Sequence, residues 1–125
     1  SLGLVGSEMC IRDSDTTGHA TPETVSALLD VLVPRLNPDI LVGHFHDTRN
    51  RAIENVMTCL DYGLRKFDSS VGGLGGCPFA PGAKGNVSTS LLHDALVAAG
   101  WHTGLDRAAL RKSEELVTKM GLKPR

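Results

Sequence analysis

The chain has 125 residues, with 13 Lys and Arg against 14 Asp and Glu, which gives a formal net charge of −1. A nearly neutral chain offers no electrostatic reason to expect a nucleic acid or an anionic membrane as a partner. No apolar run approaches the roughly 20 residues that span a bilayer. Its three cysteines have unrelated spacings and form no disulfide framework, so a reducing cytoplasm is the expected location.

Residues 1–14 are not expected to belong to the native fold. The string Leu-Val-Gly-Ser-Glu-Met-Cys-Ile-Arg-Asp, at residues 4–13, resembles the in-frame translation of a sequencing adapter. It has no helical period and no signal-peptide pattern. We interpret it as a scar, with an irregular native leader as the alternative. The native sequence then starts at Asp15, and the strand that should precede Asp15 is expected to be lost.

A helix followed by a buried strand is expected next. Thr21 and Pro22 are typical of a helix N-cap and first turn. From residue 25, apolar residues follow at i, i+3, i+4 and i+7, which is the spacing of an amphipathic helix. Pro34 ends this helix. The apolar residues 39–46 then predict a buried strand.

The alternation continues toward the C-terminus. We expect a helix over residues 50–62, a short strand over 65–71, a helix over 88–99 that starts at a Ser-Thr pair, and a strongly charged helix over 106–120. Strands that alternate with helices are typical of parallel α/β units. The sequence therefore predicts an α/β fold whose strand ends share one edge of a sheet.

A pair of histidines closes the predicted strand 39–46. Side chains on a strand alternate between its two faces, so His44 and His46 point the same way. Two imidazoles on one face can share a metal ion, or they can be hydrogen-bonded histidines of the core. Spacing alone leaves both alternatives open.

The second motif is a segment rich in Gly and Pro, residues 72–86, which contains one thiol and ends at Asn86. Its Cys77 is either a small apolar filler or a reactive group. A glycine-rich loop is a poor place to pack a core, which favours the reactive role. Cys59, by contrast, lies at helical spacing with Ala52 and Val56 and is expected in the core.

Together, the His-Phe-His-Asp-Thr motif at residues 44–48 and the string Gly-Gly-Cys-Pro-Phe-Ala-Pro-Gly-Ala-Lys-Gly-Asn at residues 75–86 resemble the 3-hydroxy-3-methylglutaryl-CoA lyase family. Members of this family are metal-dependent lyases with a TIM barrel. A whole barrel needs about 250 residues. The resemblance therefore implies that residues 15–125 are the C-terminal half of a (β/α)8 barrel, without its N-terminal half.

The resemblance also implies a function for the whole enzyme. It would be a carbon–carbon lyase of leucine degradation that uses Mg²⁺ or Mn²⁺ to cleave an acyl-CoA substrate, 3-hydroxy-3-methylglutaryl-CoA, into acetyl-CoA and acetoacetate. A homo-oligomer of the full-length enzyme is compatible with this. The chain alone is expected to be inactive. The alternatives are a lyase for a related thioester such as citramalyl-CoA, and a non-catalytic truncated half-barrel.

Residue by residue, the resemblance implies that His44, His46 and Asn86 are metal ligands. Cys77 would act in acid–base catalysis, and Asp15 would be a catalytic carboxylate near the substrate. The alternatives are purely structural roles: Asp15 as a turn residue and Asn86 as the end of a loop.

The chain departs from the family pattern directly after the histidines. Arg49-Asn50-Arg51 replaces the usual Tyr-Gly-Gln. Arg49 could bind a substrate carboxylate or a CoA phosphate, or it could be a solvated residue at a helix start. Asp47 and Thr48 are expected to orient the histidines through hydrogen bonds.

Overall fold

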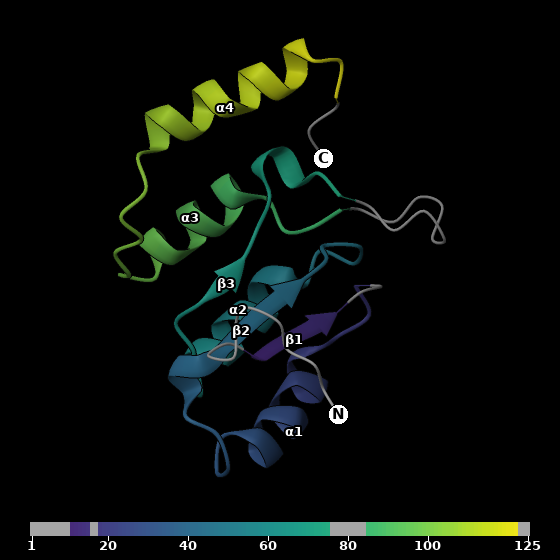
Figure 1. Ribbon diagram of the computed structural model, residues 1–125, viewed down its shortest axis with the longest axis vertical. Coiled ribbons are helices and arrows are strands. Elements are labelled where there is room, and N and C mark those ends of the chain that lie inside the picture. Colours follow the sequence, from purple (N-terminus) through teal and green to yellow (C-terminus); the bar gives the residue numbers. More distant parts are fainter. Residues whose placement is uncertain (1–10, 16–17, 76–84, 123–125) are drawn as a thin grey trace.

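The computed structural model describes residues 11–15, 18–75 and 85–122, and describes side chains from Asp15 onward. Within these ranges, three parallel strands form one sheet in the order β1-β2-β3 (Figure 1). Cys77 lies outside the described residues. The α/β class and the parallel sheet predicted from the sequence are therefore both present.

Strand β1 spans Ile11–Asp15 and pairs in parallel with β2, Leu41–Phe45, from Ile11↔Leu41 to Asp15↔Phe45. The expectation that no strand precedes Asp15 is wrong. Residues 11–14 carry a strand backbone whether or not they are native, because backbone pairing with β2 needs no particular side chain. The origin of residues 1–14 and the domain start at residue 15 stay predictions.

Helix α1, Pro22–Leu32, begins as the sequence predicted. Thr21 is its N-cap, and Thr21 and Thr24 form a reciprocal capping box through backbone and side-chain hydrogen bonds. After a short 3-10 turn, η1 at Pro38–Ile40, the chain enters β2. The predicted strand 39–46 is thus shorter than expected, because Pro38 favours a turn at its start.

Helix α2 spans Ala52–Asp61 and packs against β2 and α1. Gly63 follows it with φ +94°, a left-handed conformation that suits glycine at the end of a helix. Strand β3, Phe67–Asp68, is only two residues long and pairs with Gly43 and His44 of β2. The 3-10 helix η2, Val71–Gly73, follows it, so only two of the residues predicted as a strand over 65–71 belong to β3.

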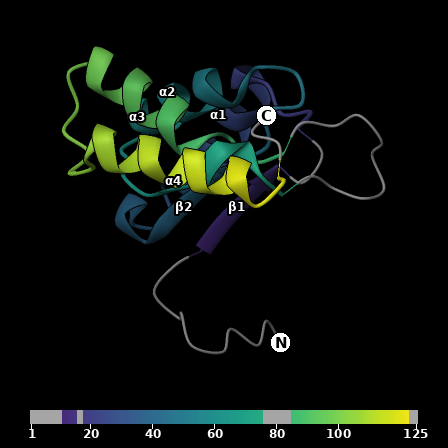
Figure 2. The ribbon, with the colours of Figure 1, turned by 90° about the horizontal axis from the view of Figure 1, so that it is seen from above.

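Helices α3, Thr89–Ala98, and α4, Arg107–Lys119, complete the described chain and contact each other and η2 (Figure 1). Their observed N-caps are Ser88 and Asp106, close to the predicted starts. Helices α1, α2 and α3 lie on the same side of β1 and β2 (Figure 2). No helix in the described part of the chain is long and apolar enough to cross a membrane.

The core lies between β2 and the helices that cover it. Its buried members are Val25, Leu29, Leu41, Phe45, Ala52, Val56, Cys59, Leu60, Leu64, Val87 and Leu92. The prediction that Cys59 belongs to the core is confirmed. One polar group is equally buried: the Asn55 amide donates to the Ala20 carbonyl oxygen at 3.1 Å. This bond ties α2 to the segment that directly precedes α1.

Candidate functional site

The carboxyl ends of the three strands bring together residues that are distant in the sequence. Asp15 ends β1 opposite Phe45, and the parallel register places His44 between Ser14 on one side and Asp68 on the other. Ligand sites of parallel α/β folds lie at this edge of the sheet. The prediction that Asp15 and the histidines share one edge is confirmed.

Residues 85–87 return to the same edge beside β2. The Asp47 amide donates to the Gly85 carbonyl at 3.0 Å, and the Val87 amide donates to the Phe45 carbonyl at 3.1 Å. These bonds enclose an antiparallel bridge between His46 and Asn86. The polar motif and the end of the glycine-rich loop, forty residues apart, are therefore neighbours through the backbone.

Glycine is required at position 85 for this approach. A Cβ atom placed there would lie 2.2 Å from the Gly73 carbonyl oxygen, which is well inside van der Waals contact. A backbone oxygen cannot rotate away as a flexible side chain can, so any larger residue would push residues 85–87 away from η2. The Gly-Asn pair is thus a packing requirement as well as a loop end.

The two imidazole rings lie on one side of the strand end, with their centroids 5.5 Å apart and their planes tilted by 49°. Burial, and next the proximity of His44, lower the pKa of His46 below its ordinary value of 6.5. Asp15 and the adjacent Asn86 act in the opposite direction without reversing the shift. The lowered pKa favours neutral His46, the form that can donate a lone pair.

Two oxygen atoms at this edge are buried and have no hydrogen-bond partner, Asp15 Oδ2 and Asn86 Oδ1. The other atom of each group is satisfied: Asp15 Oδ1 accepts from the His19 amide at 3.0 Å, and Asn86 Nδ2 donates to the Leu74 carbonyl at 3.0 Å. An unsatisfied buried acceptor costs about 1–3 kcal/mol. Such atoms call for an explanation, and a bound cation or hydroxyl would supply one.

The donor set fits a divalent cation bound by nitrogen and amide oxygen. Among the described residues, no three His, Cys, Asp or Glu side chains are grouped as a metal site. The donors that the structure does bring together are therefore His44, His46 and the unsatisfied oxygen of Asn86. Oxygen ligands suit Mg²⁺ and Mn²⁺, whereas imidazole ligands also suit Co²⁺ or Zn²⁺, so the donors fit a divalent cation of either kind.

The residues that follow the histidines lie in the turn before α2. Asp47 Oδ1 accepts from the Ala52 amide at 3.3 Å, so it caps the start of α2, and no bond from it to a histidine is seen. Thr48 packs against Gly18, where a Cβ would lie 2.4 Å from the Thr48 hydroxyl. Arg49 is exposed in the turn after the histidines.

The sequence interpretation missed Asp68. Its Oδ2 lies 3.2 Å from Nδ1 of His44, one strand away in parallel register. A signal was present, because Asp68 is the only carboxylate in the predicted strand 65–71. The sequence alone does not give the pairing register of the two strands, and this register decides which residue of the next strand lies beside His44.

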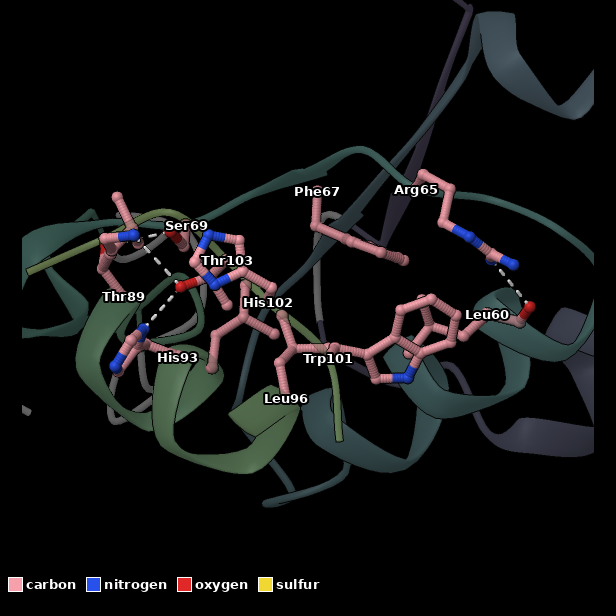
Figure 3. Close-up of a pocket in the computed structure, with 12 residues that line it drawn as sticks. Leu60, Arg65, Phe67, Ser69, Thr89, His93, Leu96, Trp101, His102 and Thr103 are labelled. Carbon is pink, nitrogen blue, oxygen red and sulfur yellow. Dashed lines mark hydrogen bonds between the residues drawn. The ribbon is translucent and has the colours of Figure 1, made fainter. Parts of the chain in front are cut away.

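A separate pocket of about 320 Å³ lies between β3, α3 and the segment that follows α3 (Figure 3). Its hydroxyls already pair with neighbours: Ser69 with Thr89 at 2.9 Å, and Thr103 with His93 at 2.7 Å. The Arg65 guanidinium stacks 4.5 Å from the Trp101 ring centroid and donates to the carbonyls of Leu60 and Leu64. These paired groups connect β3 to α3 and to the segment that follows α3. The pocket shares no residue with the site around His44 and His46.

Comparison with known proteins agrees with the geometry. The family described as HMGL-like matches residues 5–117. Hydroxymethylglutaryl-CoA lyase of Pseudomonas mevalonii is 47% identical over 96 residues, which are 77% of this chain and 32% of that protein. The (R)-citramalyl-CoA lyase of Chloroflexus aurantiacus is 43% identical over 98 residues, which are 78% of this chain and 31% of that protein. The chain spans about a third of the length of the curated relatives it matches.

The fold comparison gives the same answer. The crystal structure of the HMG-CoA lyase from Brucella melitensis superimposes with a TM-score of 0.86 at 46% identity, over 90% of this chain and 40% of that one. The solved structures that resemble this chain at high identity are TIM barrels. The predicted fold class, an α/β fold that corresponds to part of a TIM barrel, is therefore confirmed.

Proposed function

We propose, from the premise that this chain belongs to the HMGL-like family, that it forms part of a lyase that splits a 3-hydroxyacyl-CoA by retro-Claisen cleavage. The observation that carries the proposal is the convergence of His44, His46 and two unsatisfied buried oxygens, Asp15 Oδ2 and Asn86 Oδ1, at one strand edge.

His44, His46 and Asn86 would hold a divalent cation, Mg²⁺ or Mn²⁺. When bound, such an ion supplies charge stabilisation to oxygen atoms of a substrate and makes a hydroxyl proton easier to remove. The lowered pKa of His46 keeps one imidazole in the neutral form that ligation needs. The Leu74 carbonyl holds the amide NH2 of Asn86, so the amide oxygen is directed elsewhere.

Asp15 is the group that we assign to proton removal. Its Oδ2 has no partner, whereas the His19 amide holds Oδ1 at 3.0 Å, so one oxygen is anchored and the other can accept. It would take the proton of the 3-hydroxyl group. The electrons of that O–H bond then form the new carbonyl as the carbon–carbon bond breaks, and an acetyl-CoA enolate leaves.

Cys77 would protonate the enolate carbon. The thiol gives its proton to the carbon and becomes a thiolate, and both it and the protonated Asp15 return to their starting states by exchange with water. Cys77 lies outside the described residues, so this assignment depends on its place in the sequence between Gly75 and Gly85. A Cβ atom at Gly75 would lie 2.6 Å from Nδ2 of Asn86, and Gly85 directly precedes Asn86 in the sequence.

Two substrates remain candidates, 3-hydroxy-3-methylglutaryl-CoA and citramalyl-CoA, because relatives with both names match at 47% and 43% identity. Arg49, exposed one turn after His46, is a candidate for binding a carboxylate or a CoA phosphate. We favour the first substrate because two lyases with that name match at 47% and 48% identity, above the 43% of the citramalyl-CoA lyase.

The test is a chimera. The 96 matched residues of the Pseudomonas mevalonii lyase are replaced with those of this chain, and cleavage of both thioesters is measured with Mg²⁺ or Mn²⁺. Turnover of 3-hydroxy-3-methylglutaryl-CoA that is lost on His46→Ala is the expected result. A chimera that is folded by circular dichroism and binds Mn²⁺, yet cleaves neither thioester, would contradict the proposal.

A further inference from the structure

We propose that Asp68 is a positioning residue that holds His44 in a single tautomer and so directs the other ring nitrogen to the cation. This inference rests on the proposed function, because it assumes that His44 is a ligand. It concerns a residue on the strand β3, which contributes no ligand of its own.

The contact itself decides which nitrogen of His44 carries the proton. Nδ1 of His44 lies 3.2 Å from Oδ2 of Asp68. An ionised carboxylate can only accept a hydrogen bond, so Nδ1 must be protonated. In the neutral ring the lone pair then belongs to Nε2, and a partner of this kind on the outer nitrogen also makes the ligating nitrogen more basic.

The fold places this partner without help from flexible segments. His44 and Asp68 are directly paired in the register of β2 and β3, and the Gly43 amide donates to the Lys66 carbonyl at 3.0 Å beside them. Gly43 itself is closely covered, since a Cβ there would lie 2.8 Å from the Phe67 ring. The spacing between carboxylate and imidazole is therefore set by backbone pairing.

Stability does not explain the pair. The side chains of His44 and Asp68 retain 26% and 33% of their exposure, and partly exposed ion pairs contribute little to folding. A contact that adds little to folding, yet fixes the proton on one ring, is better explained by orientation.

The same segment orients a second donor by the same logic. The Leu74 carbonyl accepts from Asn86 Nδ2 at 3.0 Å and from the Ser70 hydroxyl at 2.7 Å. A carbonyl only accepts, so the amide nitrogen must face it and Oδ1 must point away. Residues 68–74 thus decide which nitrogen of His44 carries the proton and in which direction the Asn86 amide oxygen points.

His93 offers a matched contrast. Its Nδ1 lies 2.7 Å from the Thr103 hydroxyl, and a hydroxyl can donate or accept. That contact does not select a tautomer. Of these two half-buried histidines, only His44 is therefore expected to have an imposed proton position.

The test uses the 125-residue chain with ¹⁵N-labelled histidine. Long-range ¹H–¹⁵N spectra, recorded at a pH where the rings are neutral, report which ring nitrogen is protonated, and Mn²⁺ titration reports binding through line broadening. His44 is expected as the Nδ1–H tautomer in the original chain. Asp68→Asn, whose amide can donate as well as accept, should give a mixture of tautomers and weaken Mn²⁺ binding by about 10–100-fold. Asp94→Asn, on α3, should change neither.

Each outcome decides the matter. An Nε2–H or mixed tautomer of His44 in the original chain overturns the inference without any variant, even if Asp68→Asn fails to fold. Mn²⁺ binding that is equal in the original chain and Asp68→Asn overturns it while leaving the proposed metal site intact. Absence of Mn²⁺ broadening at His44 and His46 in the original chain overturns the metal site and the inference together.

Discussion

Gly75→Ala tests whether the glycine-rich segment cradles a metal donor. Gly75 has φ +93°, and a Cβ atom built on it would lie 2.6 Å from Nδ2 of Asn86, at least 0.8 Å short of the 3.4 Å of an ordinary contact. The Asn86 amide would have to move by about that amount. Its bond to the Leu74 carbonyl, now 3.0 Å, would lengthen beyond hydrogen-bond range.

The expected cost has two parts. A left-handed backbone costs a residue with a Cβ about 1–2 kcal/mol, and a lost hydrogen bond costs about 0.5–1.5 kcal/mol. Gly75→Ala should therefore lower the free energy of unfolding by about 2–3 kcal/mol. It should also weaken Mn²⁺ binding by about 10–100-fold, as loss of a partner that orients a ligand does. The assays are urea denaturation followed by circular dichroism and Mn²⁺ titration.

Gly104→Ala is the matched control. Gly104 has φ +72°, but a Cβ there would meet nothing within 4 Å. It should lose about 1–2 kcal/mol from backbone strain alone and keep its Mn²⁺ affinity. If the two variants bind Mn²⁺ equally well, the reasoning that links Gly75 to Asn86 is refuted.

His46→Ala should retain less Mn²⁺ after dialysis than the original chain, because one of few nitrogen donors is lost. The pKa of Tyr62, the only tyrosine, should lie above 10.0 because its hydroxyl donates to Asp30 at 2.7 Å. The stability that this hydrogen bond adds to the fold is present below pH 10 and is lost as pH rises through the folded-state pKa of Tyr62. In the chimera, Cys77→Ser should lower kcat by about 10²–10⁴-fold, whereas Cys59→Ser should mainly cost stability, since Cys59 is fully buried.

The controls for these predictions are also available in the chain. His93→Ala should leave Mn²⁺ retention unchanged, and equal loss in both histidine variants would remove His46 from the site. Asp30→Ala should return the ultraviolet-monitored titration of Tyr62 toward 10; an unchanged midpoint would contradict the role of Asp30. Near-full kcat in Cys77→Ser would return Cys77 to a packing role.

Much of the fold could be predicted because its signals are local. The N-cap at Thr21 and the apolar spacing that buries Val56 and Cys59 depend only on neighbouring residues. Strand β3 was predicted too long, because only two of the seven residues 65–71 find a partner in β2. Pairing with another strand decides such cases, and propensity does not.

The site was predicted less completely for the same reason. The residues that carry donors were identified from their motifs, but the partners that orient them depend on register and on loop closure. Asp68 meets His44 only through strand pairing, and the Leu74 carbonyl meets Asn86 only because the chain returns at Gly85. Asp47 was expected to orient a histidine, yet the start of α2 lies closer and takes its carboxylate.

The central claim is that His44, His46 and Asn86 hold one divalent cation. It is tested most directly by crystals of the chain grown with Mn²⁺ and an anomalous difference map collected above the manganese absorption edge. The account predicts a single strong peak in contact with a nitrogen of each imidazole and with the Asn86 Oδ1 atom that now lacks a partner. A map whose manganese peaks lie elsewhere, or which has no peak at this edge of the sheet, would contradict it.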